Sequence, residues 1–419
     1  MLYAAWQVIA CANANQWALM DLAAGRRWTF RELAEAADAL PAEEPVVYPS
    51  GAGVSFVFDV LRAWHHERIA CPLDAGQSKP AIANLPQGCV HVKTSSGSAG
   101  PSHLVAFTGA QLAADAQNIV ATMGLRPNWP NLAVISLAHS YGFSNLVLPL
   151  LLHGIPLALA PSRLPEALRS AARQFSCLTL PAVPALWRVW RDAGAIPKSV
   201  KLAISAGAAF PATLEREIFE RDGVKVHNFY GASECGGICY DAADTPRHSD
   251  DDVGAPLRGV SVTTDSEGRL VVCSKAVGET YWPEPDAALA NGTFRVADRA
   301  EIRDGRVFLL GRHGDMINVA GQKVAPENIE QTILRCPGVA ECVVFGAPDL
   351  DSVRAETIVA CVSGDPSLTV SALKEFATHH LPPWQNPRHW WILPALSDPI
   401  RGKISRAKWR ERFLAGKKF

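Results

Sequence analysis

The sequence has no excess of charge of either sign. Its 40 lysine and arginine residues nearly balance its 41 aspartate and glutamate residues, and the formal net charge is -1. A balanced chain creates no broad positive field, so the composition argues against nucleic acid as a partner. With 48% hydrophobic and 19% charged residues over 419 positions, the chain has an ordinary globular composition and a length that indicates two domains.

Long apolar runs are also missing. One rather apolar stretch, residues 135–155, is interrupted by His139, Ser140, Asn145 and His153. A membrane-spanning helix needs about 20 consecutive apolar residues, so we expect no membrane span here.

Clusters of cysteine are absent as well. The ten cysteines are scattered along the chain, and the closest pair, Cys235 and Cys239, has no other cysteine or histidine nearby. This spacing is poor for a zinc site. Because no secretory signal is recognisable, we expect a cytoplasmic protein with reduced thiols.

The chain begins with an alternation of strands and helices. Thr29 and Glu32 form a capping-box pattern that predicts the start of a helix. Residues 45–48 and 69–71 have the pattern of strands, and residues 51–64 between them have that of a helix. Strand, helix and strand at this spacing indicate a parallel α/β unit.

The end of the chain predicts a smaller α+β unit. We expect a helix over residues 326–336, strands over 340–346 and 357–363, and a second helix over 369–379. Between the two units, residues 253–273 carry turn signals at intervals that suit a small β-subdomain.

Two motifs combine small residues with chemically active side chains. Residues 93–105 read KTSSGSAGPSHLV, a loop whose backbone N–H groups and hydroxyls suit phosphates. It is not a Walker loop, because no G-K-[ST] follows, and by pattern alone a flexible loop is an equally good interpretation. In residues 228–237, NFYGASECGG, the Glu234 carboxylate suits Mg²⁺, although a single such glutamate is more often a solvated surface acid.

The motif that joins the two units is GRHGDMINVAGQKVAPENIE at residues 311–330. Together with the motifs above and with DPIRGKISR at residues 398–406, it resembles the adenylate-forming superfamily of acyl-CoA synthetases, peptide-synthetase adenylation domains and beetle luciferase. The family pattern is G-R-x-x-D-x-I-(K/N)-x-x-G-x-x-(V/L)-x-P-x-E-I-E, and Asn328 departs from it. The resemblance covers most of the chain. It implies a large α/β N-terminal domain, with parallel-sheet layers and a small β-subdomain, followed by a small α+β lid domain.

The resemblance also implies a site for ATP and Mg²⁺. In the family, Tyr230 would stack on adenine, while Asp298 and Arg312 would hold the ribose. Glu234 would bind Mg²⁺. The other nucleotide contacts that the resemblance implies come from small residues and hydroxyl groups: Ser95, Ser96, Gly97, Ser98, Gly100, Ala206, Gly207, Gly231 and Ser233.

The phosphate loop departs from the family at one point. Ser102 and His103 replace the usual proline and lysine. A histidine is mostly neutral at pH 7, so the loop loses a fixed positive charge beside the triphosphate. We therefore expect either slower catalysis by this loop than in relatives or the use of another cation.

Two further residues align with the family's catalytic positions. His139 aligns with the residue that closes over the acid, and Lys403 with the lysine that reaches the α-phosphate and the carboxylate. On their own, they would be a histidine at a strand end and a solvated lysine. Amino-acid-activating relatives have an aspartate near His139, and none occurs between residues 131 and 161, which argues against an amino acid. The nearby aromatic residues favour an aryl or a fatty acid: Tyr141, Phe143 and Phe229.

These observations predict an ATP-dependent carboxylic acid ligase. It would form an acyl- or aryl-adenylate, with a hydroxybenzoate as one favoured acid, and pass the acyl group to CoA or to the phosphopantetheine of an acyl carrier protein. Eight basic residues between positions 401 and 418 face one acid, Glu411, and suit an acidic acceptor. Two alternatives stay open: a non-catalytic member that binds nucleotide or acyl ligand, and a luciferase-like oxygenase.

The same resemblance predicts the domain limits. Residues 1–311 would form the ATP- and acid-binding domain, residues 312–315 a hinge, and residues 316–419 the lid. Gly314 falls at the family's pivot, where glycine tolerates a large change of backbone angles.

Overall fold

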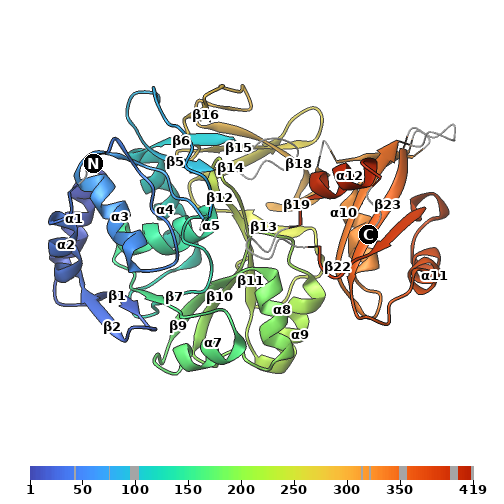
Figure 1. Ribbon diagram of the computed structural model, residues 1–419, viewed down its shortest axis with the longest axis horizontal. Helices are drawn as coiled ribbons and strands as arrows, with labels where there is room; N and C mark the ends of the chain where they lie inside the picture. Colours follow the sequence, from blue (N-terminus) through green and yellow to red (C-terminus); the bar gives the residue numbers. More distant parts are fainter. Residues whose placement is uncertain are drawn as a thin grey trace.

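The computed structural model describes most of the chain: residues 1–41, 44–74, 76–94, 103–312, 315–319, 322–348, 356–396 and 404–416. An N-terminal part with two large sheets occupies the left and centre of Figure 1. A smaller C-terminal part with its own sheet lies on the right.

A parallel sheet forms the centre of the N-terminal part. Its strands lie in the order β11-β10-β9-β7-β8-β1, and all neighbouring pairs in this series are parallel. Three of the strands are buried along their whole length, which is typical of parallel strands covered on both faces. The strands are β1 (Trp17–Asp21), β7 (Asn131–Ala133), β8 (Leu157–Leu159), β9 (Leu178–Ala182), β10 (Val200–Ser205) and β11 (Val226–Ala232).

Helices connect the parallel strands, as in βαβ units. The helix after β9 illustrates why: Pro184 occupies its first turn, where a missing N–H costs nothing, and Trp187 and Trp190 are fully buried on one face. The helices of the N-terminal part are α1 (Leu2–Ala12), α2 (Phe30–Asp38), α3 (Val54–His65), α4 (Gly109–Met123), α5 (Ser140–Gly142), a π-helical turn (Phe143–Val147), α6 (Leu148–His153), α7 (Pro165–Ala172), α8 (Pro184–Asp192) and α9 (Ala212–Asp222).

Antiparallel strands extend the same sheet on both sides. β2 adds to β1 at one edge, and beyond β11 the order continues as β12-β13-β19-β18-β15-β14, with β17 beside β18. The antiparallel strands beyond β11 form the small β-subdomain that the sequence predicts. The strands are β2 (Arg26–Thr29), β12 (Gly236–Tyr240), β13 (Asp252–Pro256), β14 (Val260–Thr264), β15 (Arg269–Ser274), β17 (Leu289–Ala290), β18 (Thr293–Arg303) and β19 (Arg306–Arg312).

The second sheet has the order β16-β6-β5-β4-β3. β3 and β4 pair in parallel with α3 between them, which confirms the predicted parallel unit. β5 and β6 are antiparallel, so Thr94 at the end of β5 lies beside Leu104 at the start of β6. The strands are β3 (Val46–Val47), β4 (Ile69–Ala70), β5 (Cys89–Thr94), β6 (Leu104–Thr108) and β16 (Thr280–Trp282).

The C-terminal part contains the helices and strands expected there. Its sheet has the order β22-β23-β24, flanked by helices and by the small pair β20 and β21. The elements are β20 (Ile317–Val319), β21 (Gln322–Val324), α10 (Pro326–Ile333), β22 (Val339–Pro348), β23 (Glu356–Gly364), α11 (Val370–His380), a 3₁₀ turn (Pro383–Gln385), β24 (His389–Ile392) and α12 (Arg406–Leu414).

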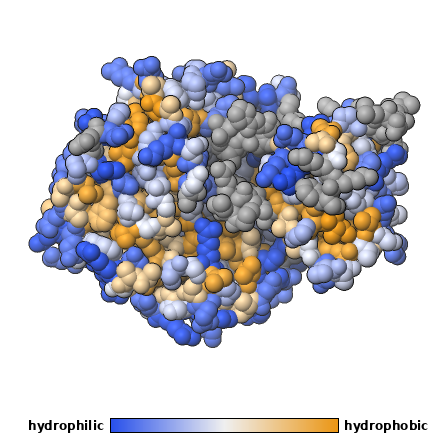
Figure 2. Space-filling view, in the orientation of Figure 1, coloured by the Kyte–Doolittle hydropathy of each residue, from blue (hydrophilic) through white to orange (hydrophobic). Residues whose placement is uncertain are grey.

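Apolar side chains collect in separate cores. Within the described residues, the main core ends at Val307, and the first core of the C-terminal part begins at Ile317. On the face drawn in Figure 2, apolar side chains form several patches among hydrophilic ones rather than one continuous band. In the part of the chain that the structure describes, no helix combines the length and the apolar character that crossing a membrane requires. All ten cysteines are free thiols.

Candidate active site

Tyr230, Asp298 and Arg312 meet at one place. β11 carries Tyr230, while Asp298 on β18 and Arg312 on β19 are direct partners in an antiparallel ladder. The Tyr230 hydroxyl donates to Oδ2 of Asp298 at 2.5 Å, and Nε of Arg312 donates to Oδ1 at 3.0 Å. Burial raises the pKa of Tyr230 well above its ordinary value, and the carboxylate of Asp298 raises it further, so the hydroxyl stays protonated.

The carboxylate of Asp298 has capacity for further donors. An ionised carboxylate offers about four lone-pair positions, and Tyr230 and Arg312 each use one of its oxygens. The side chain of Arg312 is 41% exposed, so this cluster borders solvent. A carboxylate with a guanidinium beside it fits the two hydroxyl groups of a ribose.

Glu234 lies in the turn between β11 and β12. Its backbone oxygen accepts a hydrogen bond from the N–H of Gly278 at 2.8 Å, and its Oε1 accepts one from the Tyr281 hydroxyl at 3.1 Å. Burial raises the pKa of Glu234, although hydrogen bonds from its own backbone and from Tyr281 act against this. Among the described side chains, none donates to Oε2. Tyr281 therefore holds one oxygen of this carboxylate, and a carboxylate is the kind of ligand that a hard cation such as Mg²⁺ prefers.

The small residues near Glu234 are required by close packing. A Cβ atom on Gly231 would lie 2.5 Å from the backbone oxygen of Gly236, so a side chain there would force the hairpin apart. Ser233 is half-buried in the same turn. The predicted residues Gly231, Ser233 and Glu234 therefore share one tight turn at the end of β11.

Ala206 and Gly207 lie at the neighbouring strand end. They follow β10, which pairs in parallel with β11. Gly207 has a φ of +87°, in the left-handed region that favours glycine, and Ala206 N donates to the backbone oxygen of Ala182 at 3.2 Å. Both residues are thus at the carboxyl edge of the parallel sheet, where open α/β sheets bind ligands.

His139 is paired with a carboxylate that the sequence motifs did not indicate. Its Nε2 lies 3.0 Å from Oδ2 of Asp74, and the Ser136 hydroxyl donates to Oδ1 of Asp74 at 2.7 Å. The argument against an amino acid rested on the absence of aspartate between residues 131 and 161. Asp74, which follows β4 in the chain, places an aspartate beside His139 from outside this range. The argument against an amino acid therefore no longer holds.

The aromatic residues expected near the acid divide into two groups. The Tyr141 hydroxyl donates to the backbone oxygen of Ile204 at 3.3 Å, and its ring centroid lies 6.0 Å from that of Phe229. Phe143, by contrast, is 1% exposed and stacks on His91 with ring centroids 4.5 Å apart. Phe143 therefore packs in the core, and its expected effect on the choice of acid stays a prediction.

Several predicted residues lie outside the described residues: Ser95, Ser96, Gly97, Ser98, Gly100, Ser102, Gly314 and Lys403. The flanks of the phosphate loop are described, and Thr94 pairs with Leu104 across β5 and β6. The rings of His103 and Tyr281 pack in a T-shaped arrangement, with centroids 5.7 Å apart. A hollow of about 440 Å³ opens beside these flanks and is bordered by Thr94, His103 and Trp282.

Comparison with known proteins identifies the family. A model described as AMP-binding enzyme matches residues 62–288, and one described as AMP-binding enzyme C-terminal domain matches residues 328–403. The chain belongs to the AMP-binding enzyme family. The predicted resemblance to adenylate-forming enzymes is thereby confirmed.

Relatives of this AMP-binding enzyme include acid–CoA ligases. A feruloyl-CoA synthase of Amycolatopsis is 26% identical over 366 residues, which cover 81% of this chain and 73% of that protein. An uncharacterized acyl-CoA ligase of Bacillus subtilis is also 26% identical, over 227 residues and 51% of this chain. The match covers 47% of that relative, so the chain spans about half of its length.

A solved structure confirms the predicted fold. The ATP-bound MatB of Rhodopseudomonas palustris has a TM-score of 0.86 and 18% identity, with 100% of both chains covered. The likeness includes the large α/β part and the small C-terminal part. The limits of the domains and the roles of the single residues stay predictions.

In this AMP-binding enzyme, a buried ion pair that no sequence motif indicates lies beneath the Glu234 turn. Nζ of Lys93 on β5 lies 3.8 Å from Oδ2 of Asp115 on α4, and both side chains are almost completely buried. Asp115 also accepts from Gly237 N at 3.1 Å. A Cβ atom on Gly236 would lie 2.0 Å from Oδ1 of Asp115, so the backbone of the turn rests directly on this carboxylate.

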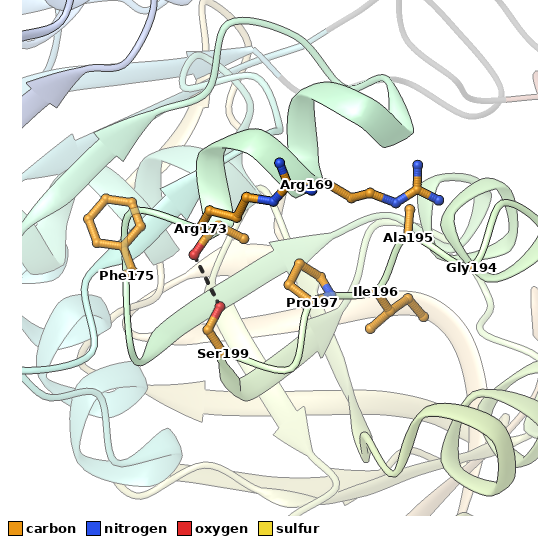
Figure 3. A pocket seen from close by; sticks show the side chains of 9 residues that line it. Arg169, Arg173, Phe175, Gly194, Ala195, Ile196, Pro197 and Ser199 are labelled. Atoms are coloured by element: carbon orange, nitrogen blue, oxygen red, sulfur yellow. Dashed lines mark hydrogen bonds between the residues drawn. The ribbon is translucent and has the colours of Figure 1, made fainter.

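A second hollow lies away from these residues (Figure 3). It measures about 350 Å³ and lies between the end of α7 and the segment that precedes β10. Arg169 and Arg173 border it, and Ser199 donates to the backbone oxygen of Ala172 at 3.3 Å. No predicted site residue lines this hollow, so it is separate from the candidate nucleotide site.

Proposed function

We propose that this protein is an ATP-dependent carboxylic acid ligase that forms an acyl- or aryl-adenylate and transfers the acyl group to a thiol. The observation that carries the proposal is the meeting of Tyr230, Asp298 and Arg312 at the sheet end that also bears Glu234. Membership of the AMP-binding enzyme family supports ATP as the nucleotide.

The described residues fit a bound nucleotide. Asp298 accepts the ribose hydroxyls, and Arg312 holds the ribose and the α-phosphate with its planar donor group. The ring of Tyr230 and the backbone at Ala206 and Gly207 lie against adenine.

The described residues also fit a metal ion. Mg²⁺ on the phosphates neutralises negative charge that would otherwise repel the incoming carboxylate. Glu234 offers one carboxylate oxygen to this ion while Tyr281 holds the other. Lys403 supplies a further positive charge at the α-phosphate, by the resemblance described above. Together, Mg²⁺ and Lys403 would lower the activation barrier of adenylation because they stabilise the negative charge on the phosphates.

The acid is an aryl or a fatty acid. The rings of Tyr141 and Phe229 are in contact, and the Tyr141 hydroxyl donates to the backbone oxygen of Ile204. His139, two residues before Tyr141 in the chain, has Asp74 as its partner. The similarity to a feruloyl-CoA synthase supports an aryl acid, such as a hydroxybenzoate. The thiol acceptor is CoA or an acyl carrier protein, which the basic C-terminal residues of the chain would attract.

Exchange of labelled pyrophosphate into ATP tests the proposal. A panel of aryl, fatty and amino acids should give exchange with at least one aryl or fatty acid. Lys403→Ala should reduce this exchange by about 10²–10³, because one preorganised charge partner contributes roughly 3–4 kcal/mol to the barrier. Exchange driven only by amino acids would refute the assigned acid class, and ATP binding without exchange for any acid would refute the ligase.

A further inference from the structure

The segment that begins at Gly278 holds Glu234 at two points. Gly278 N donates to the backbone oxygen of Glu234 at 2.8 Å, and the Tyr281 hydroxyl donates to Oε1 of the same residue at 3.1 Å. The sequence motifs contain neither Gly278 nor Tyr281. The two bonds nevertheless fix both the backbone and the carboxylate of Glu234.

The position of Tyr281 is set by its strand. On β16, Tyr281 pairs with Val105 of β6, and Trp282 pairs with Leu104. A Cβ atom on Gly278 would lie 2.7 Å from Cγ1 of Val105, so the segment passes as close to β6 as a glycine allows. β16 is therefore tightly registered on the strand that begins immediately after His103.

The backbone of the Glu234 turn is also fixed from the other side. Asp115 accepts from Gly237 N and contacts Gly236, as described above, and Lys93 balances its charge. With the turn held on both sides, the freedom that remains to Glu234 is rotation of its own side chain. The Tyr281 hydroxyl restrains that rotation.

We propose that Tyr281 is a positioning residue that orients the Glu234 carboxylate, so that Oε2 is presented to the Mg²⁺ of MgATP. The inference rests on the proposed function, because it takes MgATP as the ligand. Partners that hydrogen-bond a metal-binding carboxylate fix its orientation, and their loss typically weakens metal binding about 10- to 100-fold. Tyr281 also joins two parts of the site, since its ring lies against His103 and its hydroxyl on Glu234.

Binding of Mn²⁺ in the presence of ATP tests the proposal without measuring turnover. The free Mn²⁺ signal in electron paramagnetic resonance, compared with that of the same ATP concentration without protein, gives the dissociation constant for the metal in the ternary complex. Tyr281→Phe should raise this constant about 10- to 100-fold. Its unfolding midpoint without ligands should stay close to that of the wild type, because the ring and its packing remain.

Tyr48→Phe is the matched control. It also removes one tyrosine hydroxyl, which in the wild type donates to the backbone oxygen of Pro80 at 2.7 Å. This variant should bind Mn²⁺ as the wild type does. If Tyr281→Phe and Tyr48→Phe bind the metal equally, Tyr281 has no positioning role.

A double variant shows whether Tyr281 acts through Glu234. Glu234→Gln alone should weaken Mn²⁺ binding, and adding Tyr281→Phe should weaken it no further, because the carboxylate that Tyr281 orients is already gone. Additive losses would overturn the inference while leaving the proposed function intact. A wild type that binds no Mn²⁺ with ATP would instead refute the proposed function and the inference together.

Discussion

Asp298 accepts hydrogen bonds from two protein side chains and still borders solvent. A buried structural carboxylate accepts more hydrogen bonds from protein groups, as Glu215 does with three from Lys225 and Arg247. Asp298 differs because its cluster opens outward at the end of a sheet. The lone pairs that remain on this carboxylate can accept hydrogen bonds from the hydroxyl groups of a ribose.

Replacing Asp298 with asparagine should therefore weaken ATP binding. Hydrogen bonds to charged groups contribute about 1.5–3 kcal/mol, so we expect a loss of roughly 10- to 150-fold in affinity. Calorimetric titration with ATP and with 2′-deoxy-ATP provides the measurement: the wild type should prefer ATP, and Asp298→Asn should lose that preference. Asp265→Asn, at a carboxylate that binds Arg269, is the control and should bind both nucleotides normally. An unchanged preference in Asp298→Asn would mean that this carboxylate does not hold the ribose.

Single residues were predictable where a local motif carries them. Tyr230, Glu234 and Arg312 each lie in a run of neighbours whose types identify the position. Asp74 and Tyr281 lie in no such run, and their importance comes from partners far away in the sequence. No periodicity or spacing encodes such a contact, so the sequence alone could not have supplied it.

Most elements were predictable because each has its own local signal. The capping box at Thr29 forms as expected, with Glu32 bonded back to the Thr29 backbone. The pairing of the strands was harder. The hairpin of β1 and β2 joins the far edge of the large sheet beside β8, and β16 pairs with β6 from a distant part of the chain. Register between distant strands is decided by tertiary packing, which local patterns do not contain.

The ion pair of Lys93 and Asp115 links β5, α4 and the turn before β12, so its loss should affect all three elements. Lys93→Met leaves Asp115 as an unpaired buried charge, and breaking such a pair costs about 3–5 kcal/mol in the free energy of unfolding. Denaturant titration should show this loss, and adding Asp115→Asn should recover part of it. Equal stabilities of Lys93→Met and the wild type would contradict the importance of the pair.

The shifted pKa of Lys93 predicts that the free energy of unfolding depends on pH. Burial lowers the pKa of Lys93 below its ordinary value of 10.5, although Asp115, Cys235 and Glu234 favour its charged form. Between the lowered and the ordinary pKa, the unfolded chain binds more protons at this lysine than the folded chain does. The contribution of Lys93 to the free energy of unfolding therefore rises with pH in that interval. Lys93→Met should lose this rise, which denaturant titrations at a series of pH values just below 10.5 can measure.

At the scale of the whole molecule, the two parts have separate cores. The main core ends at Val307 and the next begins at Ile317, as far as the described residues show. One bond between the parts runs from Nη1 of Arg188 on α8 to the backbone oxygen of Ala340 on β22, at 2.6 Å. Parts of a chain that have their own cores are expected to move relative to each other unless a large hydrophobic interface joins them. The sequence predicts the pivot within residues 312–315, at Gly314.

Gly314→Pro should separate the two half-reactions. Proline fixes φ near −65°, so the C-terminal part would be held in one orientation. Pyrophosphate exchange measures adenylation, and release of the thiol ester from pre-made adenylate measures transfer. We expect the two rates to fall by factors that differ at least about tenfold, which corresponds to 1.4 kcal/mol in the barrier. Gly314→Ala is the comparison variant, because alanine restricts φ less than proline does and should therefore separate the two rates less. Equal losses in both steps would instead locate the pivot elsewhere, since a lid held in one orientation cannot impair adenylation and transfer alike.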